Sequence, residues 1–463
     1  MEKSVVIRSC QDVSDFVDEH PVGRSSILIV LIALGGIFVD AYDFTSLGVG
    51  VPTLKHAFGL TPFEVGSVTA MMAFGAVIGA IWGGRAADKV GRFKMFMIDL
   101  VLLVVAALGA ALSVNLTMLL VFRFLLGLGV GLDFPVALSF IAEFVHRNRR
   151  ASSCNLWTFV WYVAASATGL AILPFYFMGV GENLWRIAVG LGAVPALIVL
   201  ALRMKYMKES APWVAHNVGL EAAARILEAT YKVKVSVAAG AELQTRRSPA
   251  MPYLKELFSP QFRRRTILTS LICITQSMEY FAVGFNLPSI SQTLFGNTFI
   301  NAILGVIAFN IFGMVGTGLC VLVTQKMGLR RILVLGYAVV LVMLVILFSM
   351  HGKLSPEAAG LIIGLMILGH GFGPSQGMGL AALSYPTRIR GSSTGWGQGM
   401  VRIGSILGFY FFPLLSASLG FYNMMGLLTL APIIGLTASL LMNWEPVGER
   451  MDGNQEAKPA YQV

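Results

Sequence analysis

Residues 84–94 read Gly84-Arg-Ala-Ala-Asp88-Lys-Val-Gly91-Arg92-Phe-Lys94 and separate two long apolar stretches of the chain. The glycines permit a tight turn and a close approach of two helices. Asp88 and the basic residues near it can bridge the ends of neighbouring helices through charge-assisted hydrogen bonds. The segment therefore predicts a short, charged connection between two apolar helices.

The composition of the chain indicates a membrane protein. Of its 463 residues, 56% are hydrophobic and 13% are charged, whereas soluble domains carry roughly 25% charged residues. The apolar residues occur in runs of about 20, the length of a helix that crosses a bilayer. We expect about twelve such helices, at 25–50, 62–86, 94–114, 117–143, 151–178, 184–204, 266–294, 298–324, 329–350, 356–383, 391–418 and 421–443.

The charge of the connecting loops predicts how the chain crosses the membrane. Basic residues gather in every second loop, for example around Arg92 and Arg331, whereas the other loops carry few beyond Lys55 and Lys353. Basic loops are typical of the cytoplasmic side, so we expect both termini inside and an even number of helices. The same pattern explains the net charge of +10 without a nucleic-acid partner.

A long polar stretch divides the expected helices into two sets of six. We expect a cytoplasmic N-terminal tail at 1–24, an N-terminal six-helix bundle at 25–204, a cytoplasmic linker at 205–265, a C-terminal six-helix bundle at 266–444 and a cytoplasmic tail at 445–463. The linker has helical composition near 220–231, and the C-terminal tail is polar and expected to be mobile. The fold class is therefore an all-α membrane protein of two pseudo-symmetric bundles, a transporter layout that places substrate between the halves.

Other classes of protein receive no support from the sequence. The 4 cysteines have no paired spacing and 3 lie in apolar segments, so we expect neither a disulfide framework nor a zinc site. No nucleotide loop, metal-binding His/Glu spacing or nucleophile elbow occurs, so we expect no enzyme, cofactor or metal. The first helix lacks the features of a cleaved signal and is expected to be retained. A passive channel fits the duplication and the buried charges less well than a transporter, and we expect a monomer.

Three elements of the sequence carry a resemblance to a known family. The segment at 84–94 resembles the Gly-x3-Asp-x2-Gly-Arg-x-Lys signature of the major facilitator superfamily; the matching loop of the second half, 325–331, lacks the acidic residue. Glu209-Ser-Ala-Pro-Trp213 and Tyr385-Pro-Thr-Arg-Ile-Arg390-Gly391 are similar to elements of sugar porters and organic-ion transporters. The resemblance implies the major facilitator fold and the metabolite–proton symporter branch.

Charged residues and glycines at the cytoplasmic helix ends are expected to gate this transporter. A network of ion pairs between the two halves would hold the outward-facing state and would have to open for release of the substrate. The predicted gating residues are Gly84, Asp88, Gly91, Arg92, Glu143, Arg147, Arg150, Glu209, Arg388 and Arg390.

Ionisable residues inside the first half are expected to couple transport to protons. Each costs roughly 2.5–3.5 kcal/mol to place in the membrane, so it marks a functional position. Asp40 and Asp43 can face one cavity, because they lie three positions apart on a helix. Their segment Asp40-Ala-Tyr-Asp43 is similar to the Asp-Gly-Tyr-Asp motif of aromatic-acid–proton symporters. The predicted coupling residues are Asp40, Asp43, Asp133 and Arg123. The alternative is that Arg123 forms a structural pair with Asp40 or Asp43, the two acids of the first expected span.

The second half supplies the predicted site for an anion. The planar guanidinium of Arg402 can bind a substrate carboxylate; the alternative is a buried ion pair with Glu279. His370 can titrate near neutral pH, or it can satisfy backbone groups at a kink in its glycine-rich segment. The predicted substrate-binding residues are Arg402, Gln276, Glu279, Tyr42, Trp161, Tyr280, His370 and Trp396.

The sequence therefore predicts a secondary active transporter that carries a small organic acid together with protons across the bacterial inner membrane. The alternatives are a sugar or polyol–proton symporter and proton-driven efflux of a small organic compound. The sugar alternative is weakened by Gln276-Ser-Met-Glu-Tyr280, which stands where sugar porters have Gln-Gln-x-Ser-Gly, although Asn286 is kept.

Overall fold

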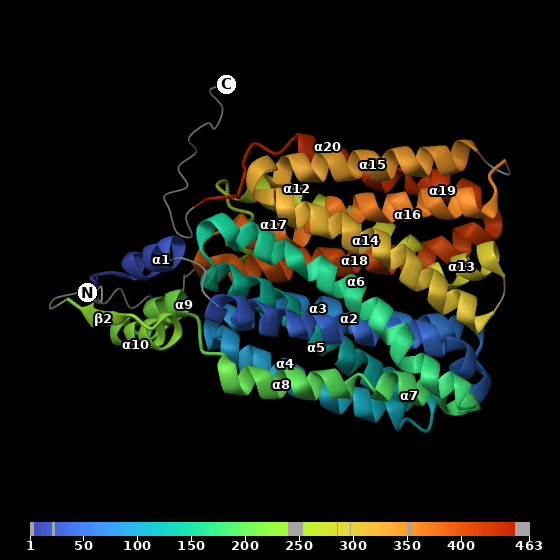
Figure 1. The fold of residues 1–463 in the computed structure, drawn as a ribbon, viewed down its shortest axis with the longest axis horizontal. Coiled ribbons are helices and arrows are strands. Elements are labelled where there is room, and N and C mark those ends of the chain that lie inside the picture. Colours follow the sequence, from blue (N-terminus) through green and yellow to red (C-terminus); the bar gives the residue numbers. More distant parts are fainter. Residues whose placement is uncertain are drawn as a thin grey trace.

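Long helices, nearly parallel to one another, form most of the structure, which is a computed structural model (Figure 1). It describes residues 4–20, 24–238, 253–284, 286–296, 298–350 and 353–449. The N-terminal half consists of α2 (Arg24–Phe58), α3 (Pro62–Val90), α4 (Arg92–Ala111), α5 (Leu116–Phe144), α6 (Arg147–Phe177), the short turn η1 (Gly181–Asn183), α7 (Leu184–Gly190) and α8 (Ala193–Tyr206).

The C-terminal half repeats this arrangement with more interruptions in its helices. It consists of α11 (Tyr253–Leu257), α12 (Arg263–Val283), α13 (Leu287–Phe295), α14 (Phe299–Met327), α15 (Leu329–Ser349), α16 (Pro356–Phe372), η2 (Pro374–Gln376), α17 (Gly377–Leu383), α18 (Thr387–Leu419), α19 (Phe421–Leu428) and α20 (Leu430–Leu440). The two halves meet where α6 packs against α14 and where α3 packs against α18.

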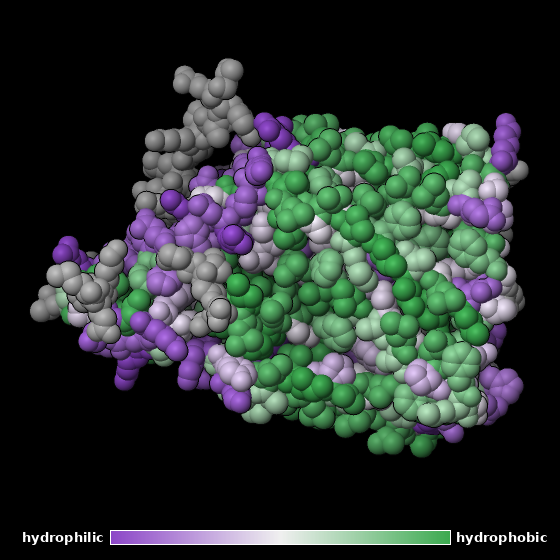
Figure 2. Space-filling model, in the orientation of Figure 1, coloured by the Kyte–Doolittle hydropathy of each residue, from purple (hydrophilic) through white to green (hydrophobic). Residues whose placement is uncertain are grey.

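The helices have the length and composition of membrane spans. Among the described residues, 11 helical spans are long and apolar enough to cross a bilayer, and the further span expected at 391–418 lies within α18. Figure 2 shows apolar surface along the bundle and hydrophilic surface gathered mainly at the end where α9 and α10 lie. The predicted all-α membrane fold is confirmed.

The N-terminal segment and the linker fold together into a small module beside the bundle, seen at the left of Figure 1. In this module β1 (Ser4–Ile7) pairs in parallel with β2 (Lys234–Val237), and α1 (Cys10–Glu19) packs on α9 (Ala211–Asn217). The helix predicted near 220–231 is α10 (Leu220–Tyr231). Ile7, Val13 and Leu227 are 0% exposed in the interior of the module. The segment that we expected to be an N-terminal tail is thus largely folded onto the linker.

The start of α4 is capped by a carboxylate from the end of the same half. The chain turns at Gly91, whose φ of +109° favours glycine, and α4 begins at Arg92. The backbone N–H groups of Arg92 and Phe93 donate to Glu209 at 2.9 and 3.1 Å. A negative charge here stabilises the helix because free N–H groups and the positive end of the helix dipole face it.

The same device recurs in the second half. The chain turns at Gly328, with a φ of +78°, and the N–H groups of Leu329 and Arg330 donate to Glu445 at 2.9 and 3.0 Å. Glu445 follows α20 as Glu209 follows α8, so the two halves share one construction. Glu445 is therefore bound to the bundle, which corrects our expectation of a free tail from this residue; positions 450–463 lie outside the described residues.

Replacing Glu445 by Ala should lower the stability of the second half. The change leaves two N–H groups at the start of α15 without their acceptor, so we expect a loss of about 1–2 kcal/mol, seen as a lower Tm in detergent. The matched control is Glu182→Ala, because the side chain of Glu182 is 66% exposed and its ion pair with the exposed His56 lies at the surface, where such a pair contributes little to stability. An equal Tm for the two variants would show that the cap contributes nothing.

Candidate functional site

Two adjoining cavities lie between the halves. The larger has an empty volume of about 1100 Å³ and the smaller of about 360 Å³, and Trp161, Tyr280 and Phe281 line both. Other residues of the larger cavity include Phe44, Thr45, Gly48, Gln292, Phe299 and Asn310. Other residues of the smaller cavity include Phe134, Trp157, Thr158, Gln276, His370 and Arg402. Both halves thus contribute residues to each of the two adjoining cavities.

Aromatic rings form the walls where the two cavities join. The ring of Trp161 lies 6.0 Å from Phe44, 6.4 Å from Phe281 and 6.4 Å from Tyr280, measured between centroids. The indole N–H of Trp161 donates to the hydroxyl of Tyr280 at 2.8 Å, which links α6 to α12. These walls offer flat apolar faces and edges, an environment suited to an aromatic ring.

Arg402 of α18 is the buried cation at the smaller cavity. It is 1% exposed, and its guanidinium lies 4.7 Å from the ring centroid of Phe44 and 5.8 Å from that of Phe134. Within the described part of the chain, its Nε has no hydrogen-bond partner. The acid whose charge acts on it is Asp40 of α2. Arg402 thus interacts electrostatically with the opposite half while it borders the cavity.

Glu279 does not pair with Arg402, so that alternative is wrong. Its carboxylate instead lies 2.7 Å from Nδ1 of His370, and the His370 ring stacks on Tyr280 at 5.3 Å. His370 is also not the group that satisfies the backbone at the kink. The carbonyl of Gly371 accepts from the side-chain amide of Gln376 at 2.9 Å and from the hydroxyl groups of Thr317 and Ser375, each at 3.2 Å. Glu279 and His370 therefore form a second polar pair beside the smaller cavity.

Asp40 and Asp43 are buried without hydrogen bonds. They are 0% and 1% exposed, and within the described residues none of their carboxylate oxygens has a hydrogen-bond partner. Arg123 of α5, which is also 1% exposed, donates to the backbone carbonyl of Asp43 at 3.5 Å and acts on the charge of its carboxylate. The structure thus brings Asp43 and Arg123 together, as the sequence suggested.

Asp133 has partners that the sequence did not predict. Its carboxylate lies 2.9 Å from Nη2 of Arg203 on α8, and Nη1 of Arg203 lies 3.5 Å from Asp99 on α4. All three side chains are 0% exposed. A signal was present, since Asp99 lies within the expected span at 94–114 and Arg203 at the end of the span at 184–204.

Tyr42 and Trp396 do not line either cavity, so we correct their assignment to the substrate site. The hydroxyl of Tyr42 donates to the carbonyl of Ala188 on α7 at 3.1 Å. The indole of Trp396 donates to Ser270 at 2.8 Å, and its ring lies 5.3 Å from that of Phe258. Both side chains serve packing between helices. Phe44 occupies the cavity face of α2 instead of Tyr42.

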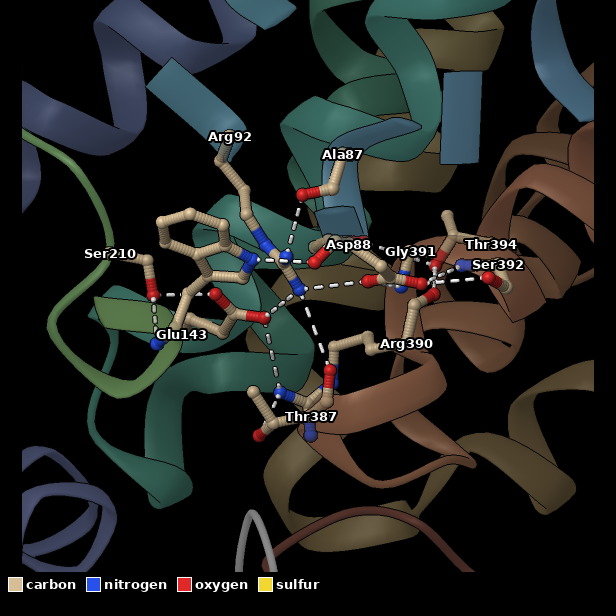
Figure 3. A network of polar contacts seen from close by, with 12 residues as sticks. Ala87, Asp88, Arg92, Glu143, Ser210, Thr387, Arg390, Gly391, Ser392 and Thr394 are labelled. Atoms are coloured by element: carbon tan, nitrogen blue, oxygen red, sulfur yellow. Dashed lines mark hydrogen bonds and ion pairs between the residues drawn. The ribbon is translucent and has the colours of Figure 1, made fainter. Parts of the chain in front are cut away.

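At the end of the bundle that carries the module, a polar network joins the helices (Figure 3). Glu143, which is 0% exposed, lies 2.8 Å from Arg92 and 3.8 Å from Arg390 of the opposite half. It also accepts from the hydroxyl of Ser210 at 2.5 Å. Arg92 lies 3.1 Å from Asp88 as well, so each charge in the network has an opposite charge beside it.

Asp88 connects the two halves directly. Its carboxylate accepts from the N–H and hydroxyl of Ser392 at 2.8 and 2.7 Å, and from the N–H of Gly391 at 3.1 Å. A Cβ at Gly84 would collide with the carbonyl of Gly391, so this approach of α3 to α18 requires glycine. We call this end the closed end. The larger cavity lies away from it, since Gly48 and Phe299 belong to the far ends of α2 and α14.

The remaining predicted gating residues surround the network. Arg150 pairs with Asp18 of the module and donates to the carbonyl of Glu449 at 3.4 Å, so it joins the module to the second half. Arg388 pairs with Glu256 of α11. Burial lowers the pKa of His146, and the positive charges of Arg147 and Arg150 lower it further. Glu209 caps α4, as described above, and burial raises its pKa.

The comparisons with known proteins agree with this architecture. The model of the family described as Major Facilitator Superfamily matches residues 33–408. The chain is 26% identical to the inner membrane metabolite transport protein YgcS of Escherichia coli, over 93% of each chain, and 26% identical to a gallate transporter of Pseudomonas putida, over 86% of this chain and 87% of that one. The structure of the proton:xylose symporter XylE from E. coli, bound to a glucose derivative, superposes with a TM-score of 0.78, at 18% identity, over 92% of this chain and 97% of that one.

Replacing Asp88 by Asn should loosen the closed end. The bonds to Ser392 and Arg92 lose their charge assistance, and each such bond is worth about 1.5–3 kcal/mol, so an open state should gain at least about tenfold in population. The readout is the labelling rate of Cys320 by a membrane-permeant maleimide, resolved by peptide mass spectrometry. Cys320 is 0% exposed and its sulfur lies 3.7 Å from Nδ2 of Asn155 in the opposite half.

Glu182→Gln serves as the control for this experiment, because it removes an acid far from the network and should label at the wild-type rate. Labelling of Asp88→Asn at the wild-type rate would contradict a closing role for Asp88.

Proposed function

Because the chain belongs to the Major Facilitator Superfamily, we propose that it is a symporter that carries a small aromatic carboxylate together with a proton across the inner membrane. It is a membrane transporter of the metabolite or sugar type and not an enzyme. One observation carries the choice of substrate: Arg402, a buried guanidinium without a hydrogen bond at Nε, stands at the end of a cavity walled by aromatic rings.

The carboxylate of the substrate would bind to Arg402. A planar guanidinium donates paired charge-assisted hydrogen bonds to a carboxylate, and the low polarity of the site strengthens these bonds. The substrate ring would then lie among Trp161, Phe134 and Phe281, where it gains both apolar burial and edge-to-face contacts. Gln276 and the His370–Glu279 pair stand ready for a polar substituent on the ring.

A sugar fits this environment less well than an aromatic acid. A monosaccharide carries hydroxyl groups around its whole ring, and each buried hydroxyl without a partner costs free energy. The rings on both sides of Arg402 offer few such partners. A gallate transporter is among the relatives, but so are a glucose transporter and an arabinose–proton symporter of similar identity, so the choice of an aromatic acid rests on the residues around Arg402.

Competition for Arg402 would couple the substrate to a proton. In the structure the charge of Asp40 acts on Arg402 from the opposite half. A bound substrate carboxylate would take over the guanidinium and leave Asp40 as an uncompensated buried anion, which is costly. A proton on Asp40 or on its neighbour Asp43 removes that charge. The anion and the proton therefore bind best together, which is the requirement for symport.

The closed end would face the cytoplasm. The loops at this end carry the basic residues typical of the cytoplasmic side, and the module lies there with the N-terminal segment. In this orientation the larger cavity would lie toward the outside, and the proposed cycle would receive its substrate from there in this state. Release would require the bonds of Asp88 and Glu143 to the second half to break.

Replacing Arg402 by Gln should weaken the binding of an aromatic acid. Loss of the charge-assisted pair should raise the Kd at least about tenfold. The measurement is a thermal-shift and calorimetric titration of the purified protein with gallate, 4-hydroxybenzoate and nicotinate, and with D-xylose and D-glucose as neutral probes. Lys353→Gln, in an exposed position, removes one positive charge and should bind as the wild type does.

The two classes of substrate give opposite results in this titration. Binding of the sugars but of none of the acids would overturn the proposed substrate class. An acid that binds equally to wild type and to Arg402→Gln would show that Arg402 is structural.

Replacing Asp43 by Asn should separate substrate movement from proton movement. The variant keeps the shape of the site but cannot take part in proton transfer, so uptake driven by a pH gradient into proteoliposomes should be lost. Exchange of labelled for unlabelled substrate, which needs no net proton movement, should persist. Gradient-driven accumulation at the wild-type level would remove Asp43 from the coupling path.

A further inference from the structure

The interior of the N-terminal half contains a group of ionisable side chains that the proposed transport cycle does not yet use. Arg203 lies 2.9 Å from Asp133 and 3.5 Å from Asp99, and the three residues come from α8, α5 and α4. Nη2 of Arg203 also donates to the carbonyl of Ala33 at 3.1 Å, and its guanidinium lies 3.9 Å from the ring centroid of Phe96. The group is therefore held on every side by the bundle.

The acids of this group outnumber its cation. Two carboxylates share one guanidinium, and Asp40 of α2 is a third acid whose charge acts on both of them. Asp40 itself is counterbalanced by Arg402 and influenced by Asp43 and Arg203. These are the charged groups that face the site from α2, α8 and α18. With both Asp99 and Asp133 ionised, the site would retain one uncompensated negative charge, which costs several kcal/mol in a dry interior.

Unused hydrogen-bonding capacity points to a ligand at this site. Within the described residues, Oδ2 of Asp99, Oδ2 of Asp133 and both oxygens of Asp40 have no partner, although the three side chains are 0% exposed. Both carboxyl groups approach the same guanidinium, that of Arg203, at 3.5 and 2.9 Å, so they lie beside each other at one cation. The group also presses against α2: a Cβ at Gly36 would collide with Asp133 and Arg203. Among the possible ligands, a proton suits this tightly packed site because it needs no further space.

We propose that Asp99 and Asp133 form a second proton-binding site, in which one shared proton makes the group with Arg203 neutral, and that the transported proton occupies this site before it leaves. The second part of this inference rests on the proton symport proposed above. In each transfer a carboxylic acid gives its O–H proton to the carboxylate of the next residue, so that charge and atoms balance at every step.

The position of the pair suits a site of release. Arg203 lies in the last turn of α8, and Asp99 lies two turns into α4, which begins at Arg92 in the closed end. Asp43 with Arg123 lies further toward the cavity side, and Asp40 is electrostatically linked to both groups. Along α2, Asp43, Asp40 and Gly36 follow one another toward the closed end, and Asp133 lies against Gly36. Asp99 is joined to Asp133 through Arg203, so the acids succeed one another from the cavity side toward the closed end.

Infrared spectroscopy of the purified full-length protein at neutral pH tests the shared proton. Asp99→Asn leaves Asp133 and Arg203 as a balanced pair, so the wild-type-minus-variant spectrum should show loss of the C=O band of one protonated carboxylic acid and no loss of carboxylate bands. Asp133→Asn should give the same difference, since Asp99 and Arg203 remain. The exposed Glu182→Gln should instead lose carboxylate bands. Loss of carboxylate bands from Asp99→Asn would show that the pair is doubly ionised and would overturn the proposal.

Transport in proteoliposomes tests whether this proton is carried. Asp99→Asn should keep exchange of the labelled aromatic acid but lose at least about tenfold in accumulation driven by a pH gradient, the change expected from about 1.4 kcal/mol of lost coupling. Full accumulation by the variant would overturn the carrying role. If the wild type shows no gradient-driven uptake of any acid probe, the proposed function fails, whereas the infrared result still decides whether the pair binds a proton.

Discussion

A charge buried in the bilayer needs an opposite charge or a proton, and this constraint organises the structure. Four of the buried arginines interact with an acid on another helix: Arg92 with Glu143, Arg203 with Asp133, Arg123 with Asp43 and Arg402 with Asp40. The first three associations lie within the N-terminal half and help to hold it together. Arg402 and Asp40 belong to different halves, so their balance changes when the halves move or when an anion enters. The same kind of interaction, between buried opposite charges, thus stabilises the bundle and would couple substrate to proton in the proposed cycle.

The two halves share a construction but differ in chemistry. In each half, a glutamate that follows the last helix caps the start of the third membrane helix. Glu209 caps α4, and Glu445 caps α15. The acids Asp40, Asp43, Asp99 and Asp133 all lie in the N-terminal half, whereas the cavity cation Arg402 and the Glu279–His370 pair lie in the C-terminal half. In the proposed cycle the first half would hold the proton and the second the anion. Either one bound alone would leave an uncompensated charge.

Much of the fold could be predicted from the sequence, because composition and the charge of loops act locally. The spans and the duplication follow from such patterns, whereas the meeting of Arg123 with an acid of the first span was only one of the alternatives that the charges allowed. The partners of buried charges could not, because they depend on how each helix is rotated against its neighbours. At about 100° per residue, Tyr42 faces α7 while Phe44 faces the cavity, and nothing in the motif Asp40-Ala-Tyr-Asp43 fixes that rotation. Arg203 and Asp99 were visible as charges in apolar runs, but their meeting with Asp133 joins three helices.

The pairing of β1 with β2 has a consequence for the order in which the protein folds during its synthesis. β1 emerges from the ribosome first, yet its partner strand follows only after the helices α2–α8. The first strand must therefore wait, unpaired, until the whole N-terminal half has been synthesised, and the apolar interior of the module stays uncovered for that time. Completion of the module then marks a finished half-transporter.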